Sequence, residues 1–291
     1  MPTTKEITLA KYAGFCYGVK RAVDTVKKLK LENPDKEICI LGELIHNSQV
    51  IDDLRNSGIS TITDLPEQGG GICVVRTHGQ SPETFEKIEN AGFEPYDLTC
   101  PDVKKVQQKA VELVQNGYYL VIVGKEEHPE VSDIKANARL YGDKIIVSTS
   151  VEELRTSENE LKEHKKIGVV VQTTQMLSTL NPIVEYLTSI SKELVVANTI
   201  CPSTSKRQNE VRELAQQNDL MIIVGSKNSA NTTHLADISN EITTTIHIES
   251  ADELNNYKDL IEKSQKIGVS AGASTPQNII DEVINYLKIM S

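Results

Sequence analysis

The stretch FEPYDLTC, residues 93–100, and the following PDVKKVQQKAVELVQN, residues 101–116, hold the pattern that decides the fold. A strand-like segment leads to Cys100, and apolar residues with helical spacing begin directly after it. Pro101 opens the expected helix, where proline is tolerated because the N–H that it lacks would have no partner there. The same arrangement occurs in EITLAKYAGFC (6–16) before YGVKRAVDTVKKLKL and in KELVVANTIC (192–201) before PSTSKRQNEVRELAQQN. Cys16, Cys100 and Cys201 therefore mark a threefold repeat.

Each repeat continues in the same order after its cysteine. An apolar strand ends in a polar loop in EICILGELIHNSQV (37–50), YYLVIVGKEEHPEV (118–131) and DLMIIVGSKNSANT (219–232). A later strand ends in small polar residues in GICVVRTHGQSPE (71–83), KIGVVVQTTQMLS (166–178) and KIGVSAGASTPQN (266–278). Counted from the cysteines, the equivalent loop positions are His46, His128 and Asn228 in the first set and His78, Thr173 and Ser274 in the second.

Strands that alternate with helices predict an α/β protein with parallel sheets. In such sheets, ligand-binding groups gather at the carboxyl ends of the strands. The three cysteines and the six loop positions all fall at such ends. We therefore expect three similar α/β domains facing one central point, at residues 1–98, 99–199 and 200–291. The alternative is a chance resemblance among ordinary βα units.

Composition and charge exclude several classes of function. The net charge of −10 argues against a nucleic-acid-binding protein, which needs a basic surface. No apolar run approaches the roughly 20 residues that span a membrane, and the N-terminus lacks the pattern of a secretory leader, so a cytoplasmic location is expected. No nucleotide-binding motif of the G-x-G-x-x-G or G-x-x-x-x-G-K-[ST] type is present. Electrons for any redox reaction must therefore come from another protein.

Three thiolates at one point suit either zinc or an iron–sulfur cluster. The chain has no C-x-x-C motif of the kind that builds structural zinc sites. A 4Fe–4S cluster usually has four cysteine ligands, so three would leave one iron open to substrate. A single free cysteine is usually a buried inert thiol, and we expect this of Cys39 and Cys73, which lie inside strands.

The loops at the strand ends contain groups that suit an anionic substrate. Imidazoles such as His46, His78 and His128 bind diphosphate oxygens. The third repeat offers Ser226, Lys227, Asn228 and Ser274, and glycine-rich loops of this kind form anion-binding nests. Ordinary turn chemistry is the alternative for this composition. Glu130, in a closed site, could donate a proton, with Thr173 as its relay; alone, it would be read as a surface carboxylate.

Two basic residues follow each cysteine, one turn into the expected helix: Lys20 and Arg21, Lys104 and Lys105, Lys206 and Arg207. A local positive patch would steer an acidic electron-donor protein towards this acidic chain. The alternative is a solvated helix face.

The motifs GFCYGVKRA, ELIHN, THG, DLTCP, GKEEHPEV, QTTQ, GSKNS and AGAS together resemble the 4-hydroxy-3-methylbut-2-enyl diphosphate reductases, in that family's order from residue 14 to residue 274. The resemblance implies a trefoil of three α/β domains around a 4Fe–4S cluster bound by Cys16, Cys100 and Cys201. It implies reduction of the allylic diphosphate to isopentenyl and dimethylallyl diphosphate, with electrons from ferredoxin or flavodoxin. It assigns substrate binding to His46, His78, His128, Thr173, Ser226, Lys227, Asn228 and Ser274, and proton delivery to Glu130 and Thr173.

Two other functions fit parts of the pattern. A non-catalytic iron–sulfur sensor or scaffold would keep the three cysteines but has no need of Glu130, Thr173 and the anion-binding loops together. A zinc hydrolase acting on a phosphorylated substrate would use a thiolate-bound metal to activate water.

Overall fold

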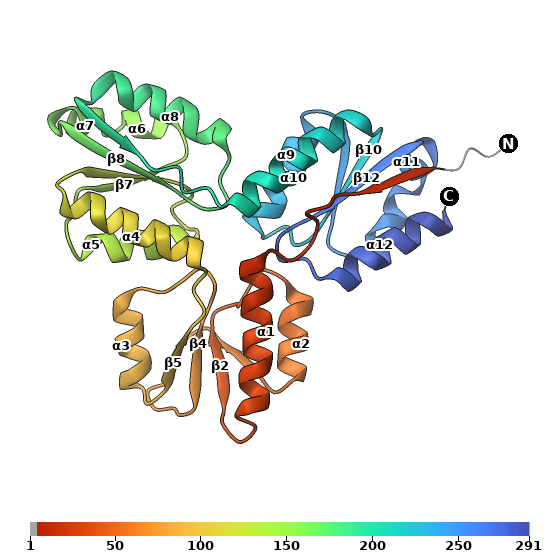
Figure 1. The fold of residues 1–291 in the computed structure, drawn as a ribbon, viewed down its shortest axis with the longest axis horizontal. Helices are drawn as coiled ribbons and strands as arrows, with labels where there is room; N and C mark the ends of the chain where they lie inside the picture. The colour runs from red at the N-terminus through yellow and green to blue at the C-terminus, as the bar shows by residue number, and fades with distance from the viewer. Residues whose placement is uncertain (1–4, 291) are drawn as a thin grey trace. The chain divides into compact units, whose positions relative to one another are not determined.

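The strands form three four-stranded sheets in this computed structural model, which describes residues 5–290. The first sheet has the order β3 (Ser60–Ile62), β2 (Ile38–Leu41), β4 (Ile72–Val75), β5 (Glu94–Asp97), and the second has β7 (Ile145–Ser148), β6 (Tyr119–Val123), β8 (Lys166–Val171), β9 (Glu193–Val196). The third has β11 (Thr244–Ile248), β10 (Leu220–Val224), β12 (Lys266–Ala271), β1 (Glu6–Leu9) (Figure 1). All neighbouring strands pair in parallel, so the predicted α/β class with parallel sheets is confirmed.

The helices repeat in the same order as the strands. The helices after the three cysteines are α1 (Tyr17–Glu32), α4 (Pro101–Gln115) and α9 (Pro202–Gln217), and the last two begin at their prolines, as expected. Strands β2, β6 and β10 lead to α2 (Ser48–Asn56), α5 (Pro129–Arg139) and α10 (Ala230–Asn240). Strands β4, β8 and β12 lead to α3 (Pro82–Asn90), α8 (Leu177–Ile190) and α12 (Gln277–Ile289). Short helices complete the second and third repeats: α6 (Val151–Arg155), α7 (Glu158–Glu163), η1 (Ala251–Tyr257) and α11 (Lys258–Lys263).

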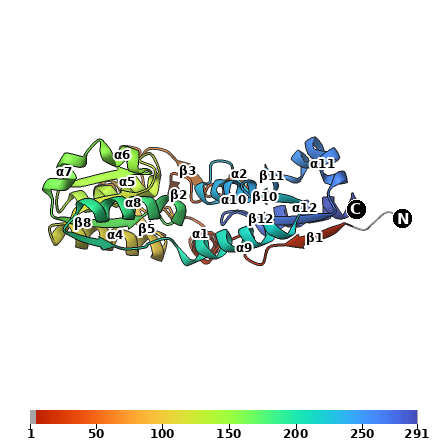
Figure 2. The same ribbon diagram turned by 90° about the horizontal axis from the view of Figure 1, so that it is seen from above.

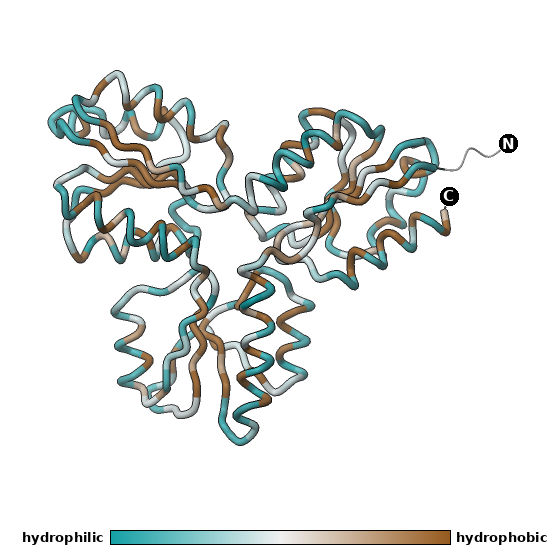
Figure 3. Tube along the Cα trace, viewed as in Figure 1, coloured by the Kyte–Doolittle hydropathy of each residue, from teal (hydrophilic) through white to brown (hydrophobic). Residues whose placement is uncertain are grey.

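Continuous apolar strands form the cores. Strands β6 and β10 read YLVIV and LMIIV and are buried at every residue, which is typical of parallel strands covered on both faces. One face of the second sheet packs against α6, α7 and α8, and the other against α4 and α5. Hydrophobic residues accordingly concentrate along the strands (Figure 3). Cys39 and Cys73 are 1% and 0% exposed in the first sheet, which confirms their prediction as core residues.

Two compact units divide the described chain differently from the three predicted domains. The first unit contains Ile45–Ser57 with the residues before Thr25 and after Cys201, and the second contains Thr25–Leu44 and Gly58–Cys201. Strand β1, expected within the first domain, is an edge strand of the third sheet, where Glu6–Leu9 pairs with β12 (Figures 1 and 2). The division at residues 98 and 199 stays a prediction.

Residues 1–4 and residue 291 lie outside the described residues. The first four belong to the N-terminal segment that lacks the sequence pattern of a secretory leader. Among helices of residues 5–290, none combines the length and hydropathy required to span a bilayer.

Candidate active site

Each of the three cysteines is held by its backbone to the loop that follows a neighbouring strand. The N–H groups donate to carbonyl oxygens as follows: Cys16 to Ala273 at 3.1 Å, Cys100 to Thr77 at 3.0 Å and Cys201 to Thr173 at 2.9 Å. These bonds continue the parallel pairing of β1 with β12, β5 with β4 and β9 with β8. The sheet therefore places each thiol beside a loop that the sequence singles out as a candidate ligand loop.

All three sulfur atoms lie at the starts of long helices. All three are free cysteines, partly exposed, and each directly precedes a long helix. The Cys16 sulfur accepts the Val19 N–H at 3.4 Å, so it faces the positive end of α1. Cysteine sulfur is the usual ligand of iron–sulfur clusters, so each of these positions could supply one.

Two of these thiols belong to the second unit and share one neighbourhood. Cys100 is the N-cap of α4, and Asp102 in the first turn of that helix accepts a hydrogen bond from the Cys201 sulfur at 3.2 Å. Three cysteines outside any disulfide, each at a helix start, supply the kind of donor atoms that an iron–sulfur cluster takes. Across residues 5–290, the structure groups no three histidine, cysteine or acidic side chains as around a single metal ion.

Glu130 and Thr173 form the central polar contact of the second unit. The Glu130 carboxylate accepts hydrogen bonds from the Thr173 N–H and from its hydroxyl, both at 2.6 Å. His128 caps α5 by accepting the Glu130 N–H on Nδ1 at 3.2 Å, and its ring lies edge-on to that of His78 with centroids 5.7 Å apart. The structure therefore brings together four of the predicted site residues.

Burial raises the pKa of the Glu130 carboxyl group towards neutral pH. Glu130 is 1% exposed, and burial raises its pKa to about 7 against the opposing effect of the two Thr173 hydrogen bonds. The charge of Asp133, one turn further along α5, raises the same pKa. The pKa of Asp133 is itself raised to about 7, because burial outweighs the attraction of Arg76. Glu130 is thus buried inside the protein, unlike the surface carboxylate that its sequence context alone suggests.

The strand register corrects two of the predicted equivalences between repeats. Val75, Val171 and Ala271 pair with the ends of β2, β6 and β10, which makes Thr174, rather than Thr173, the counterpart of His78 and Ser274. The N-cap residues of α2, α5 and α10 are Asn47, His128 and Ser229. His128 is therefore itself an N-cap, whereas His46 and Asn228 each lie one residue before an N-cap. The first repeat has a one-residue longer loop between strand and cap, which counting from the cysteines could not reveal.

In the first unit, His46 and Ser274 lie in contact. The Ser274 hydroxyl donates to the His46 carbonyl oxygen at 3.2 Å, and the Ser226 hydroxyl oxygen accepts the Asn228 N–H at 3.2 Å. A cleft of about 210 Å³ adjoins them, lined by Asn47, Ser48, Gln49, Ser226, Glu249, Ser250, Glu253 and Ile279. The loops after β2, β10 and β12 thus meet at one edge of this unit.

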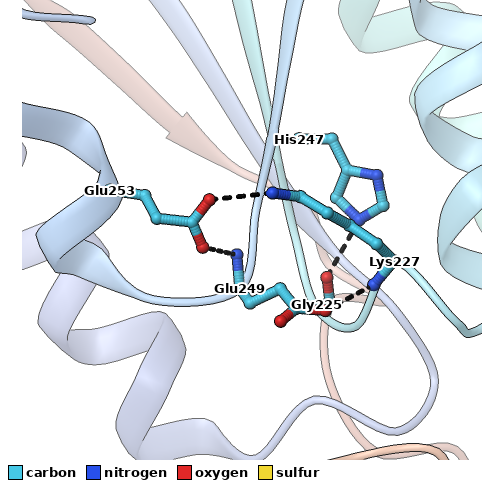
Figure 4. Close-up of polar contacts among 5 residues, drawn as sticks. All are labelled: Gly225, Lys227, His247, Glu249 and Glu253. Carbon is cyan, nitrogen blue, oxygen red and sulfur yellow. Dashed lines mark hydrogen bonds and ion pairs between the residues drawn. The ribbon is translucent and has the colours of Figure 1, made fainter. Parts of the chain in front are cut away.

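Lys227 contacts two acidic residues, one through its backbone and one through its side chain, as Figure 4 shows. Its N–H donates to Glu249 at 2.6 Å, and its ammonium pairs with Glu253 at 2.9 Å. Glu253 also accepts the Glu249 N–H at 2.7 Å, and His247 Nε2 lies 2.9 Å from the Gly225 carbonyl oxygen. These contacts fix the backbone of the 225–229 loop against β11 and the residues that follow it. Sequence reasoning missed both glutamates, although the pattern of Ser250 followed three residues later by Glu253 is a capping-box signal.

The basic pairs after the cysteines do not form a uniform exposed rim. Lys20, Lys104 and Lys105 each pair with an aspartate, at 2.8, 2.6 and 3.1 Å. Arg207 is 4% exposed and donates to the Gly14 carbonyl oxygen at 2.5 Å. Arg207 is therefore not available to a docking surface, because its guanidinium group is used inside the first unit. That some of the other basic residues steer an electron donor stays a prediction.

Fold and site together define a class: a threefold-repeated parallel α/β protein that carries one thiol and two polar loops in each repeat. A model of the LytB protein family matches residues 7–288. The chain belongs to the LytB family, which confirms the resemblance seen in the sequence motifs.

Curated relatives of the chain are enzymes named 4-hydroxy-3-methylbut-2-enyl diphosphate reductase. The relative from Syntrophotalea carbinolica is 39% identical and covers 98% of this chain and 99% of its own length. The one from Geobacter sulfurreducens is 40% identical, with 97% of each chain covered. Both names denote an oxidoreductase.

Solved structures of such reductases match the fold over nearly the whole chain. One, described as the terminal enzyme of the non-mevalonate pathway, is 37% identical with a TM-score of 0.73 and covers 98% of this chain and 99% of its own. The reductase of Plasmodium falciparum is 26% identical with a TM-score of 0.87 and covers 97% and 87%.

Proposed function

We propose that this protein reduces 4-hydroxy-3-methylbut-2-enyl diphosphate to isopentenyl diphosphate and dimethylallyl diphosphate. Family membership and the names of the relatives support the substrate. The observation in the structure that carries the proposal is the buried Glu130 carboxyl held by Thr173, because this reaction needs an acid that stays protonated near neutral pH. A sensor or scaffold protein has no use for such a group.

The reaction is a reductive dehydroxylation. The substrate C–O bond breaks, a C–H bond forms, and two electrons and two protons are consumed as water leaves. We propose that Cys16, Cys100 and Cys201 bind a 4Fe–4S cluster, which when bound supplies electrons singly and an iron open to the substrate hydroxyl. A ferredoxin or flavodoxin would deliver the electrons from outside, and the cytoplasmic location expected from the sequence stays part of this proposal.

The polar loops would hold the diphosphate. We assign this role to His46, His78, His128, Thr173, Ser226, Asn228 and Ser274, with Lys227 contributing the backbone of its loop. Imidazole, hydroxyl and amide donors bind phosphate oxygens without a fixed excess of positive charge, which suits a chain of net charge −10. Because the Lys227 N–H already has Glu249 as acceptor, the diphosphate would have to displace that carboxylate to use it.

Glu130 would supply protons from the position that Thr173 fixes. Its neutral form is populated near neutral pH, since burial holds its pKa at about 7. After donating, the carboxylate keeps two strong hydrogen bonds from Thr173, which stabilise the charge that it acquires. The Thr173 hydroxyl could relay a proton to the carboxylate while it takes another from solvent water, so the pair could act more than once in a turnover.

The test uses anaerobically purified protein with a reduced viologen dye and the allylic diphosphate. We expect a brown protein that oxidises two equivalents of dye per substrate and forms both isomeric products, identified by mass spectrometry. A brown protein without turnover would indicate the sensor or scaffold. A colourless protein that releases phosphate would indicate the zinc hydrolase.

A further inference from the structure

The connection that leads to Cys16 differs from those leading to the other two cysteines. It comprises residues 10–15, whereas residues 98–99 lead to Cys100 and residues 197–200 to Cys201. The two shorter connections are fixed by their own side chains. Asp97 accepts the Thr99 N–H at 2.8 Å. Likewise, the Thr199 hydroxyl accepts the Val171 N–H at 2.7 Å and donates to its carbonyl oxygen at 2.5 Å.

Helix α9 supplies the corresponding contacts for the 10–15 connection. The two carboxylate oxygens of Glu210 accept the N–H groups of Lys11 and Tyr12, at 2.6 and 2.9 Å. Each bond joins a charged acceptor to a backbone donor, which is the stronger kind of protein hydrogen bond. The N–H groups at the start of the connection, where no strand partner remains, are thereby satisfied.

One turn earlier on α9, Arg207 fixes the other end of the connection. Its Nη2 donates to the Gly14 carbonyl oxygen at 2.5 Å, and its Nη1 donates to the Ser203 carbonyl oxygen at 3.2 Å. Gly14 has φ of +88°, and a Cβ there would lie 3.1 Å from Ile280 Cδ1. The backbone two residues before Cys16 therefore has a left-handed conformation that favours glycine, in a place where a side chain would crowd α12.

We propose that Arg207 and Glu210 are positioning residues, which clamp residues 10–15 so that the Cys16 thiolate is held in place for its cluster. The inference rests on the proposed function in one respect, that Cys16 is an iron ligand. Neither residue touches the sulfur. They act through the backbone of residues 10–15. At the end of this connection, the Cys16 N–H donates to the Ala273 carbonyl oxygen at 3.1 Å.

The experiment compares Glu210→Ala, Glu210→Gln and Arg207→Gln with the controls Arg212→Gln and Glu213→Gln, whose side chains are exposed on the same helix. Hydrogen–deuterium exchange of the peptide that covers residues 10–16 is measured on iron-free protein. In Glu210→Ala we expect exchange to be faster by about tenfold, because charged hydrogen bonds to two amides are lost. Peptides around Cys100 and Cys201, and both controls, should exchange as in the wild type.

Two further readouts connect the clamp to the thiol. In the iron-loaded protein, iron release to a chelator should be several-fold faster in the clamp variants. In the iron-free protein, alkylation of Cys16 relative to Cys201 should rise several-fold. Arg207→Gln is left out if circular dichroism shows that it does not fold. The test then rests on the same measurements in Glu210→Gln, whose site is only half-buried.

Unchanged exchange in Glu210→Ala would overturn the clamp. Faster exchange with unchanged iron release and unchanged alkylation would show that the connection is held without positioning Cys16, which also overturns the inference. A wild-type protein that binds no iron would instead overturn the proposed function, and the exchange result would still stand.

Discussion

Thr173 donates both its backbone N–H and its hydroxyl to the Glu130 carboxylate, each at 2.6 Å. The threonine follows β8 and the glutamate opens α5, so two loops of the second unit converge on one buried acid. A carboxylate bound in this way is oriented as well as buried. In the proposed reaction, this pair would set both where the proton is held and how readily it leaves.

Replacing Glu130 by Gln should reduce turnover by at least about 100-fold, the usual size of a general-acid contribution. The amide keeps the volume but has no proton to give, so the KM for the allylic diphosphate should change little. Turnover is measured with reduced viologen. Glu127→Gln, exposed on the same loop, is the matched control and should retain wild-type activity. Normal turnover of Glu130→Gln would show that another group carries the proton.

Stability should decrease as the pH rises from about 4.5 to about 7. The ordinary pKa of Glu130 is 4.5 and its folded pKa is about 7, so within this window the folded protein binds more protons than the unfolded chain. Asp133, raised from 3.8 to about 7, contributes in the same direction. The free energy of unfolding, from urea titrations of iron-free protein, should therefore fall with pH, at most by about 1.4 kcal/mol per pH unit for each group. Glu130→Gln should flatten this dependence, and an equally steep dependence in that variant would contradict the assignment.

Thr173→Val should move the pH–activity profile upward. The hydroxyl hydrogen bond lowers the pKa of Glu130, so its removal leaves burial less opposed and raises that pKa. Because the acid must be protonated to act, the alkaline limb of kcat should shift to higher pH. Thr188→Val, exposed on α8, provides the control. An unshifted limb would mean that Glu130 is not the titrating acid.

Serine in place of Cys16, Cys100 or Cys201 should abolish activity and remove most bound iron, measured per chain after anaerobic reconstitution. Serine at Cys39 or Cys73 should leave iron content and activity largely intact, since both thiols are buried in the first sheet. Full iron content in Cys100→Ser would disprove the ligand assignment.

Glu253→Gln should raise the KM for the diphosphate several-fold and leave kcat nearly unchanged. Glu253 binds both the Lys227 ammonium and the Glu249 N–H, so its charge supports the 225–229 loop from outside the reacting centre. Glu262→Gln, exposed on α11, is the control. A loss of kcat without a change of KM would place the effect in the chemistry instead.

The repeat and the parallel α/β class were predictable from the sequence, because they depend on local order. A strand, a polar loop and a helix leave their signal within some fifteen residues, and three copies reinforce one another. The cysteines at helix starts and the core thiols Cys39 and Cys73 are found where this local reasoning places them.

Tertiary structure alone decided the relations between distant segments. Strand β1 pairs with β12 at the other end of the chain, so no local pattern assigns it to the third sheet. Thr174 rather than Thr173 matches His78, because hydrogen-bond register and not residue count sets equivalence. Arg207 looks like an exposed cation in a helical sequence, yet it is buried against Gly14. The raised pKa of Glu130 likewise follows from burial, which is a property of the packed protein and not of its sequence neighbours.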